Sequence, residues 1–380
     1  MSISRRSAVK PFHAMDILAE ANRLSALGKP VISMAVGQPS DPAPQPVLAA
    51  ARRALEAGRI GYTNALGTDA LRGRIARFYQ DHYGVEIDRA RVAVTTGSSS
   101  GFNLAFLAMF DAGDRVAITR PGYPAYRNIM TALGIEVVEI PVGPGEGGLT
   151  AERLGEIHRI KPLNGLLFAS PANPTGAVMP AGELKQLILA AESLGIAVIS
   201  DEIYHRLSHI GPDMTALSIS ENVTVINSFS KYYCMTGWRV GWMVLPEPLV
   251  RPVERIAQSL YISPPELSQI AAVEAFCGAE ELDSVKARYG ERRLLLIDRL
   301  PRLGFDLAAS MDGAFYAWCD VSKHTEDSMA FAKKMLAETF VAATPGHDFD
   351  PAGGERFMRF SYAGRPEDMA EALDRIEKWL

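Results

Sequence analysis

Short apolar runs alternate with helical patterns between about residue 68 and residue 245. The helical pattern is clear in residues 182–194, where Leu184, Leu187 and Ile188 recur at helical spacing. The apolar runs are short and are bounded by Gly, Pro or polar residues, which is typical of buried strands. We predict strands over residues 91–95, 114–119, 134–140, 165–169, 195–200 and 223–227. This alternation indicates an α/β layer with a mainly parallel sheet.

The pattern changes after about residue 265. A long helical stretch is followed by shorter apolar runs at 314–319 and 357–361 and by a final helical pattern, which together predict a smaller α+β domain. Residues 30–46 are rich in proline and are typical of a segment that crosses between domains. We therefore expect a large domain over residues 46–285, and a small domain built from 1–45 and 286–380.

Composition narrows the class of protein. The 380 residues are 48% hydrophobic and 22% charged, which is ordinary for a soluble enzyme. A net charge of -5 without a basic cluster argues against nucleic-acid binding, and no apolar stretch is long enough to span a bilayer. Neither the three scattered cysteines nor the seven histidines have metal-ligand spacing, so we predict no metal site. With no secretory signal pattern near the N-terminus, we expect a cytoplasmic protein.

Polar residues follow the predicted strands at the point where each strand ends. Ser98, Tyr123, Asn173 and Asp201 each follow a different strand, and residues 228–231 follow the run at 223–227. Ligands of parallel α/β sheets bind outside the carboxyl ends of the strands. The sequence therefore predicts one binding site to which five segments contribute.

Residues 228–239 carry the most specific chemistry. Lys231 follows a hydroxyl-rich turn, and Arg239 comes eight positions later. An amine that can hold an aldehyde as a Schiff base, together with hydroxyls and a guanidinium for a phosphate, suits pyridoxal 5'-phosphate (PLP). Residues 96–101 open a predicted helix, whose N-terminus would cradle a phosphate. Each motif also has an ordinary alternative, which is a solvated lysine in the first case and simple serine capping in the second.

These motifs, with the Ser-Pro-Ala-Asn-Pro-Thr-Gly segment at 170–176, resemble the class I/II PLP-dependent aminotransferases of fold type I, which are aspartate aminotransferase-like. The resemblance covers residues 37–359. It implies a large domain with a mainly parallel seven-stranded sheet between helices, and a smaller α+β domain that closes over the site. It also implies ping-pong transfer of an amino group from an L-amino acid to a 2-oxo acid through pyridoxamine phosphate, in a homodimer with shared sites.

The resemblance assigns roles residue by residue. Lys231 would be the Schiff-base lysine and proton carrier, Asp201 would pair with the pyridine nitrogen, and Tyr204 would donate to the phenolic oxygen. The other positions matched to the family's cofactor site are Ser98, Ser99, Tyr123, Asn173, Ser228, Ser230 and Arg239, with Tyr62 reaching the phosphate of a neighbouring subunit. Gly37, Asn173 and Arg359 match the site for the substrate carboxylate.

Three alternatives stay open at this point. The same scaffold also carries C–S β-lyases, and a related module senses ligands in transcription regulators. The regulator needs a DNA-binding domain upstream, for which we expect no room here. Residues 143–148 satisfy the G-x-G-x-x-G pattern, but they contain a proline and no acidic residue follows about twenty positions later, so we predict a loop rather than a dinucleotide site.

The substrate side chain is less constrained by the sequence. Some aspartate-specific relatives carry a lysine where this chain has Ser99. This difference argues against an acidic substrate but leaves it open, because a partner subunit could supply a cation. Phe12, Tyr62 and Tyr123 would suit an aromatic or aliphatic side chain.

Overall fold

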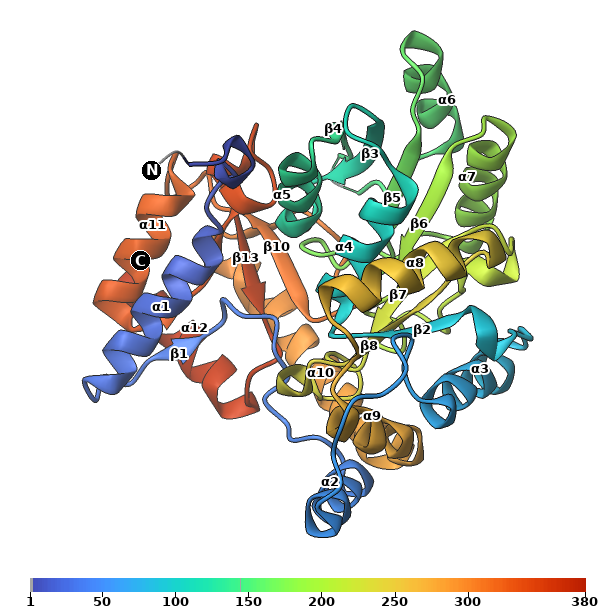
Figure 1. Cartoon of the computed structure of the whole chain (residues 1–380). Coiled ribbons are helices and arrows are strands. Elements are labelled where there is room, and N and C mark those ends of the chain that lie inside the picture. The colour runs from blue at the N-terminus through green and yellow to red at the C-terminus, as the bar shows by residue number, and fades with distance from the viewer. Residues whose placement is uncertain (1–2, 144) are drawn as a thin grey trace.

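A seven-stranded sheet forms the centre of the larger part of the chain (Figure 1). The structure is a computed structural model that describes residues 3–143 and 145–380. The strands are β2 (Val92–Thr95), β3 (Arg115–Arg120), β4 (Glu136–Pro141), β5 (Gly165–Ala169), β6 (Ala197–Asp201), β7 (Thr224–Ser228) and β8 (Gly241–Val244), in the spatial order β2-β8-β7-β6-β5-β3-β4. β8 pairs antiparallel with β2 and β7, and the other neighbours are parallel.

The mainly parallel sheet is confirmed, and each of the six predicted runs overlaps a strand within two residues at either end. β8 was not among those runs. It is only four residues long and follows closely on the polar segment that carries Lys231 and Arg239, so no separate apolar run marks it.

Both faces of the sheet are covered by helices, which explains why its strands are continuously apolar. Leu166 and Phe168 of β5 pack into one hydrophobic cluster and Leu167 into the other, because successive side chains of a strand point to opposite faces. α3 (Asp69–Tyr83), α6 (Ala151–Ile160), α7 (Ala181–Ser193) and α9 (Glu266–Val273) contribute to the first cluster, and α4 (Ser98–Met109), α5 (Pro124–Leu133) and α8 (Glu247–Leu260) contribute to the second.

A second sheet lies beside the first. It contains β9 (Asp306–Leu307), β10 (Tyr316–Asp320), β12 (Thr344–Pro345) and β13 (Phe357–Ser361), in the order β12-β13-β10-β9, and all its pairs are antiparallel. The helices of this part are α1 (His13–Ala26), α11 (Ser328–Thr339) and α12 (Pro366–Trp379), while α2 (Gln45–Ala57) packs against α9. The predicted run at 314–319 began two residues too early, because Ala314 has a left-handed backbone (φ 56°) that keeps it outside β10.

The two ends of the chain meet in this second part. β1 (Ile32–Ser33) pairs in parallel with β11 (Val341–Ala342), and Figure 1 shows the blue α1 beside the red and orange C-terminal elements. α10 (Ala279–Arg302) is continuous across residues 285 and 286, so the expected boundary lies within a helix. Short 3-10 helices complete the fold at Arg5–Ser7, Arg89–Arg91, Ala216–Ser218, Thr236–Trp238, Glu274–Cys277, Gly346–Asp348 and Gly354–Arg356.

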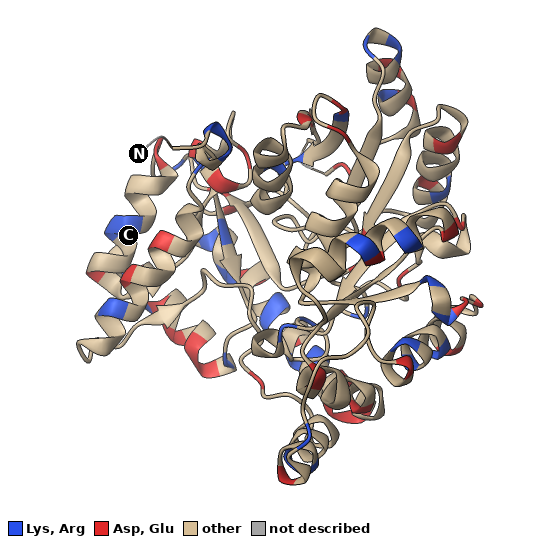
Figure 2. Cartoon of the chain, viewed as in Figure 1, with Lys and Arg blue, Asp and Glu red and all other residues tan. Residues whose placement is uncertain are grey.

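Acidic and basic residues are interspersed over the helices of both parts (Figure 2). Among the residues that the structure describes, no helix is both long and apolar enough to cross a membrane. Within the same residues, no group of three or more His, Cys, Asp or Glu side chains could hold a metal ion.

Candidate active site

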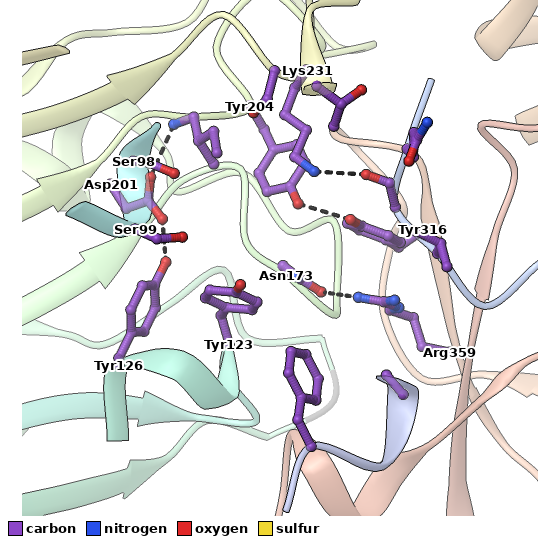
Figure 3. A pocket seen from close by; sticks show the side chains of 18 of the residues that line it. Ser98, Ser99, Tyr123, Tyr126, Asn173, Asp201, Tyr204, Lys231, Tyr316 and Arg359 are labelled. Atoms are coloured by element: carbon purple, nitrogen blue, oxygen red, sulfur yellow. Dashed lines mark hydrogen bonds between the residues drawn. The ribbon is translucent and has the colours of Figure 1, made fainter. Parts of the chain in front are cut away.

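One pocket lies where the carboxyl ends of the parallel strands face β13 and the N-terminal segment (Figure 3). The strand ends converge because β2, β5, β6 and β7 all run in the same direction in the sheet. The predicted site residues that line the pocket are Gly37, Ser98, Ser99, Tyr123, Asn173, Asp201, Tyr204, Ser230, Lys231, Arg239 and Arg359. Segments that lie more than 300 residues apart in the sequence therefore meet at this pocket.

The amine of Lys231 points into the pocket from the turn that follows β7 (Figure 3). Nζ donates a hydrogen bond to the carbonyl oxygen of Gly37 at 2.6 Å. Loss of solvation lowers the pKa of Lys231 to about 8, and the positive charges of Arg359 and Arg239 act in the same direction. A larger fraction of this amine is therefore neutral near pH 8 than of an ordinary lysine.

Asp201 is the last residue of β6 and is almost fully buried. Its carboxylate accepts hydrogen bonds from the hydroxyl of Tyr126 and, at 3.1 Å, from the backbone N–H of Ile203. Burial raises the pKa of Asp201 to about 6, although both hydrogen bonds and the charge of Lys231 oppose this shift. A buried carboxylate facing a pocket is suited to pairing with a cationic ring nitrogen.

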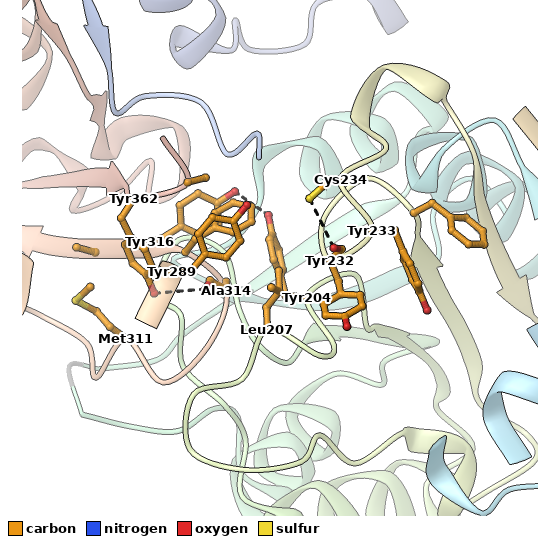
Figure 4. Packing of buried hydrophobic residues seen from close by; sticks show 14 of the residues in the cluster. Tyr204, Leu207, Tyr232, Tyr233, Cys234, Tyr289, Met311, Ala314, Tyr316 and Tyr362 are labelled. Atoms are coloured by element: carbon orange, nitrogen blue, oxygen red, sulfur yellow. Dashed lines mark hydrogen bonds between the residues drawn. The ribbon is translucent and has the colours of Figure 1, made fainter. Parts of the chain in front are cut away.

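Tyr204 is held by a packed group of aromatic side chains behind the pocket (Figure 4). Its ring meets Phe315 and Tyr316 edge to face, each at 5.7 Å between centroids, and its hydroxyl lies 2.8 Å from that of Tyr316. Tyr316 also explains the glycine at position 37, because a Cβ there would lie only 1.7 Å from the Tyr316 hydroxyl oxygen.

Arg359 presents a buried guanidinium from β13 on the opposite wall. Nη1 donates to Oδ1 of Asn173 at 2.8 Å, and Nη2 donates to the carbonyl of Ala35 at 2.5 Å. The guanidinium carbon lies 4.3 Å from the ring centroid of Tyr316 and 4.7 Å from that of Phe349. Nε is buried and has no hydrogen-bond partner among the described residues, so the group retains donor capacity for a carboxylate.

Ser98, Ser99 and Arg239 surround the end of the pocket predicted to hold a phosphate. Both serines lie in the first turn of α4, where backbone N–H groups lack intrahelical partners. Gly97, which precedes them, has φ 74°, and a Cβ at this position would lie 2.4 Å from Nη2 of Arg239. Glycine is therefore needed for the guanidinium to approach the start of the helix.

Comparison with known proteins identifies the family. The sequence profile described as aminotransferase class I and II matches residues 29–376. The chain belongs to the class I and II aminotransferases. Over its whole length, this aminotransferase is 50% identical to the valine–pyruvate aminotransferase of Mycobacterium tuberculosis, 98% of which is covered.

Solved structures agree with this assignment. A crystal structure of an aminotransferase from Mycobacterium tuberculosis matches with a TM-score of 0.96 and 48% identity, covering 100% of this chain and 99% of the other. The aspartate aminotransferase of Thermus thermophilus with maleate matches with a TM-score of 0.93 and 30% identity over 100% of both chains. The predicted transaminase activity and the aspartate aminotransferase-like fold type I are thereby confirmed.

The class I and II aminotransferases are PLP-dependent enzymes, and the pocket of this aminotransferase fits that cofactor. Two features of the pocket support the fit. Gly97 leaves room for Arg239 beside the start of α4, and the buried Asp201 carboxylate lies in the same pocket as the Lys231 amine.

Two tyrosines of the pocket were missed at the level of the sequence. Tyr126 lies three residues after Tyr123, so the two side chains share a face at the start of α5. That spacing could have identified Tyr126, but its contact with Asp201 depends on how α5 packs against the sheet. Tyr316 lies in an apolar strand and is indistinguishable there from a core aromatic residue.

Two predicted residues do not line the pocket. Ser228 is buried, and its Oγ lies 2.9 Å from that of Ser230. It therefore stabilises the turn that carries Lys231. Tyr62 is 83% exposed on the surface of this chain. The G-x-G-x-x-G segment lies in the loop between β4 and α6, except for Pro144, which is outside the described residues.

Proposed function

We propose that this aminotransferase binds PLP through Lys231 and moves an amino group from an aliphatic L-amino acid to a 2-oxo acid by a ping-pong mechanism. The observation that carries the proposal is the position of the Lys231 amine, in one pocket with the buried Asp201 carboxylate and the Arg359 guanidinium. These groups suit the aldehyde, the ring nitrogen and the substrate carboxylate, respectively.

The cofactor would lie between the two ends of the pocket. Asp201 would pair with its ring nitrogen, Tyr204 and Asn173 would approach its phenolic oxygen, and Tyr123 would lie against its ring. Ser98, Ser99, Ser230 and Arg239 would hold its phosphate, with Ser228 supporting the turn. When bound, PLP supplies an aldehyde for the amine and a ring that withdraws electrons from the substrate Cα.

The residues of the chain then perform the remaining tasks. Arg359 and Asn173 bind and orient the substrate carboxylate, while the carbonyl of Gly37 orients the Lys231 amine at 2.6 Å. Nζ of Lys231 accepts the proton released from the substrate Cα, a task suited to an amine whose pKa is lowered to about 8.

An aliphatic donor is supported by the lining of the pocket. Phe12, Ala14 and Met15 line the pocket and add apolar surface to it. The cationic side chains that line the pocket within the described residues are Lys231, Arg239 and Arg359, and each already has a role. None of them is available for a second substrate carboxylate. The similarity to a valine–pyruvate aminotransferase favours valine as donor and pyruvate as acceptor.

We further propose a two-domain enzyme that works as a homodimer. Lys231 belongs to the proposed large domain (46–285) and Arg359 to the proposed small domain (1–45 and 286–380), so a substrate bound to both would draw the domains together. Tyr62 would complete the phosphate site of a partner subunit, which its 83% exposure permits.

A transamination screen tests this function. Valine, alanine, phenylalanine and aspartate are offered as donors, each with pyruvate or 2-oxoglutarate as acceptor. We expect valine with pyruvate to be among the fastest pairs, and Lys231→Ala to abolish both turnover and the covalent attachment of PLP to the protein. A clear preference for aspartate would contradict the substrate proposal, and normal turnover by Lys231→Ala would contradict the mechanism.

A further inference from the structure

α1 begins without a cap from its own sequence. The residue before its first turn is Phe12, which cannot accept a hydrogen bond through its side chain. Asp348 takes this role from more than 300 residues away. Its Oδ1 accepts from the N–H of His13 at 2.9 Å, and its Oδ2 accepts from the N–H of Ala14 at 2.7 Å. A carboxylate in this place satisfies two orphan donors and interacts favourably with the helix dipole.

The cap is buried and held rigidly. Asp348 is 3% exposed, and its carbonyl accepts a hydrogen bond from Nη2 of Arg127 at 2.8 Å. The next residue, Phe349, packs its ring 4.7 Å from the guanidinium of Arg359. The carbonyl of Phe349 accepts from the N–H of Gly122 at 3.0 Å, directly before Tyr123. Residues 348 and 349 thus contact three walls of the pocket at once.

The start of α1 forms one of these walls. Phe12, Ala14 and Met15 line the pocket, and the ring of Phe12 lies 6.1 Å from that of Tyr123. All three residues belong to the cap position or to the first helical turn. Their positions therefore depend on where the helix begins, and this is the part of a helix that frays first when a cap is lost.

We propose that Asp348 is a positioning residue for substrate specificity. By capping α1, it holds Phe12, Ala14 and Met15 as the surface against which the side chain of the amino donor packs. This inference rests on the proposed function, in which the donor is aliphatic. Loss of the cap affects the first turn rather than the whole helix, because Ile17 and Ala21 anchor the rest of α1 in the core.

The test compares Asp348→Ala and Asp348→Asn with a matched control, Asp327→Ala. Asp327 is the N-cap residue of α11, where its Oδ1 accepts from the N–H groups of Met329 at 2.9 Å and Ala330 at 3.1 Å, and it does not line the pocket. The readouts are kcat and KM for valine and for alanine, and amide hydrogen exchange of residues 13–16.

We expect Asp348→Ala to lower kcat/KM for valine about fivefold to tenfold, mainly through KM, as expected for loss of a helix cap. Alanine, whose side chain is too short to depend on this wall, should be nearly unaffected, so discrimination between the two donors shrinks. Exchange at residues 13–16 should accelerate. Asp348→Asn, which can still accept one hydrogen bond, should fall between the wild type and Asp348→Ala, and Asp327→Ala should leave discrimination unchanged.

If Asp348→Ala lowered kcat/KM equally for valine and for alanine, or left amide hydrogen exchange at residues 13–16 unchanged, the inference would be overturned. Failure of the proposed substrate is distinguishable, because it appears in the wild-type protein as poor turnover of valine. In that case the same variants are compared on the preferred donor and on alanine. The role of Asp348 is then tested by the ratio of the two kcat/KM values.

Discussion

At the scale of a single residue, Tyr126 contacts the carboxylate that we propose pairs with the cofactor, that of Asp201. Its hydroxyl donates to the Asp201 carboxylate, and its ring packs between Phe102, at 4.9 Å, and Tyr123, at 5.3 Å. Tyr126→Phe should keep this packing and lose only the hydrogen bond. Because a bond to a charged group is worth about 1.5–3 kcal/mol, we expect kcat to fall roughly tenfold to a hundredfold.

Steady-state kinetics and cofactor titration check this prediction. Tyr79→Phe is the control, since Tyr79 is buried and its hydroxyl accepts a hydrogen bond from Nε1 of Trp242, which does not line the pocket. Unchanged kcat in Tyr126→Phe would show that the hydroxyl has no role.

In the cofactor-free protein, the amine of Lys231 should react with aldehydes at a lower pH than an ordinary lysine does. Burial lowers the pKa of its amine to about 8, so the neutral, nucleophilic form increases as the pH rises through about 8. We expect trapping of added pyridoxal by borohydride, followed by peptide mapping, to label Lys231 half-maximally near this pH. Half-maximal labelling above pH 10 would contradict a desolvated amine. The other lysines mapped in the same digest provide the internal comparison.

At the scale of an element, hydrogen bonds of Glu202 connect the end of β6 to the segment around Thr215 and Ala216. Its buried carboxylate accepts from the hydroxyl of Thr215 at 2.9 Å and from the N–H of Ala216 at 2.8 Å. The segment from Asp201 to Tyr204, which carries two proposed cofactor contacts, is thereby attached to the 3-10 helix Ala216–Ser218.

This element should make stability depend on pH. Burial raises the pKa of Glu202 from 4.5 to about 8, so its favourable contribution is complete below pH 4.5 and is lost as the pH rises through 8. Nδ1 of His205 lies 3.4 Å from the carboxylate of Glu202. Because burial lowers the pKa of His205 to about 3, its effect on the free energy of unfolding is confined to pH values below 6.5. We therefore expect the free energy of unfolding to fall between pH 6.5 and 8.5, and to fall less in Glu202→Gln.

Urea unfolding of the cofactor-free protein at both pH values measures the difference. Glu156→Gln, on the exposed side of α6, serves as the control and should behave like the wild type. If the free energy of unfolding changed equally between the two pH values in Glu202→Gln and in the wild type, Glu202 would not titrate in this range.

At the scale of the whole molecule, the proposed sharing of sites between subunits makes a distinct prediction. Lys231→Ala and Tyr62→Ala should each give dimers of low activity. In a mixed dimer, the subunit with an intact Lys231 receives an intact Tyr62 from its partner, so one site is complete. Random exchange produces mixed dimers in about half of the population, so we expect about a quarter of wild-type activity after mixing.

Activity after denaturation and refolding of the mixture, compared with each variant refolded alone, checks this expectation. If Tyr62 acted within its own subunit, both sites of the mixed dimer would be defective and mixing would restore nothing. Sedimentation of the wild-type protein separately tests whether it is a dimer.

The sequence alone determined the layered α/β architecture and the chemical character of the site. Apolar runs and their turn residues are local, so β5 and β13 were predicted with their observed bounds. The segment around Lys231 is equally local, because hydroxyls, amine and guanidinium lie within twelve residues of one chain. The resemblance then extended these motifs to Asp201, Asn173 and Arg359, which meet in the pocket.

Only the tertiary structure decided which distant residues support that chemistry. The contact of Tyr126 with Asp201, the exclusion of any side chain at position 37 by Tyr316, and the capping of α1 by Asp348 join segments that lie from 75 to more than 300 residues apart. The hydrophobic periodicity of the sequence does not predict such pairs, because each depends on how helices and sheets pack. The local sequence specifies the proposed reacting groups, whereas packing between distant elements determines how those groups are held and how the pocket is lined.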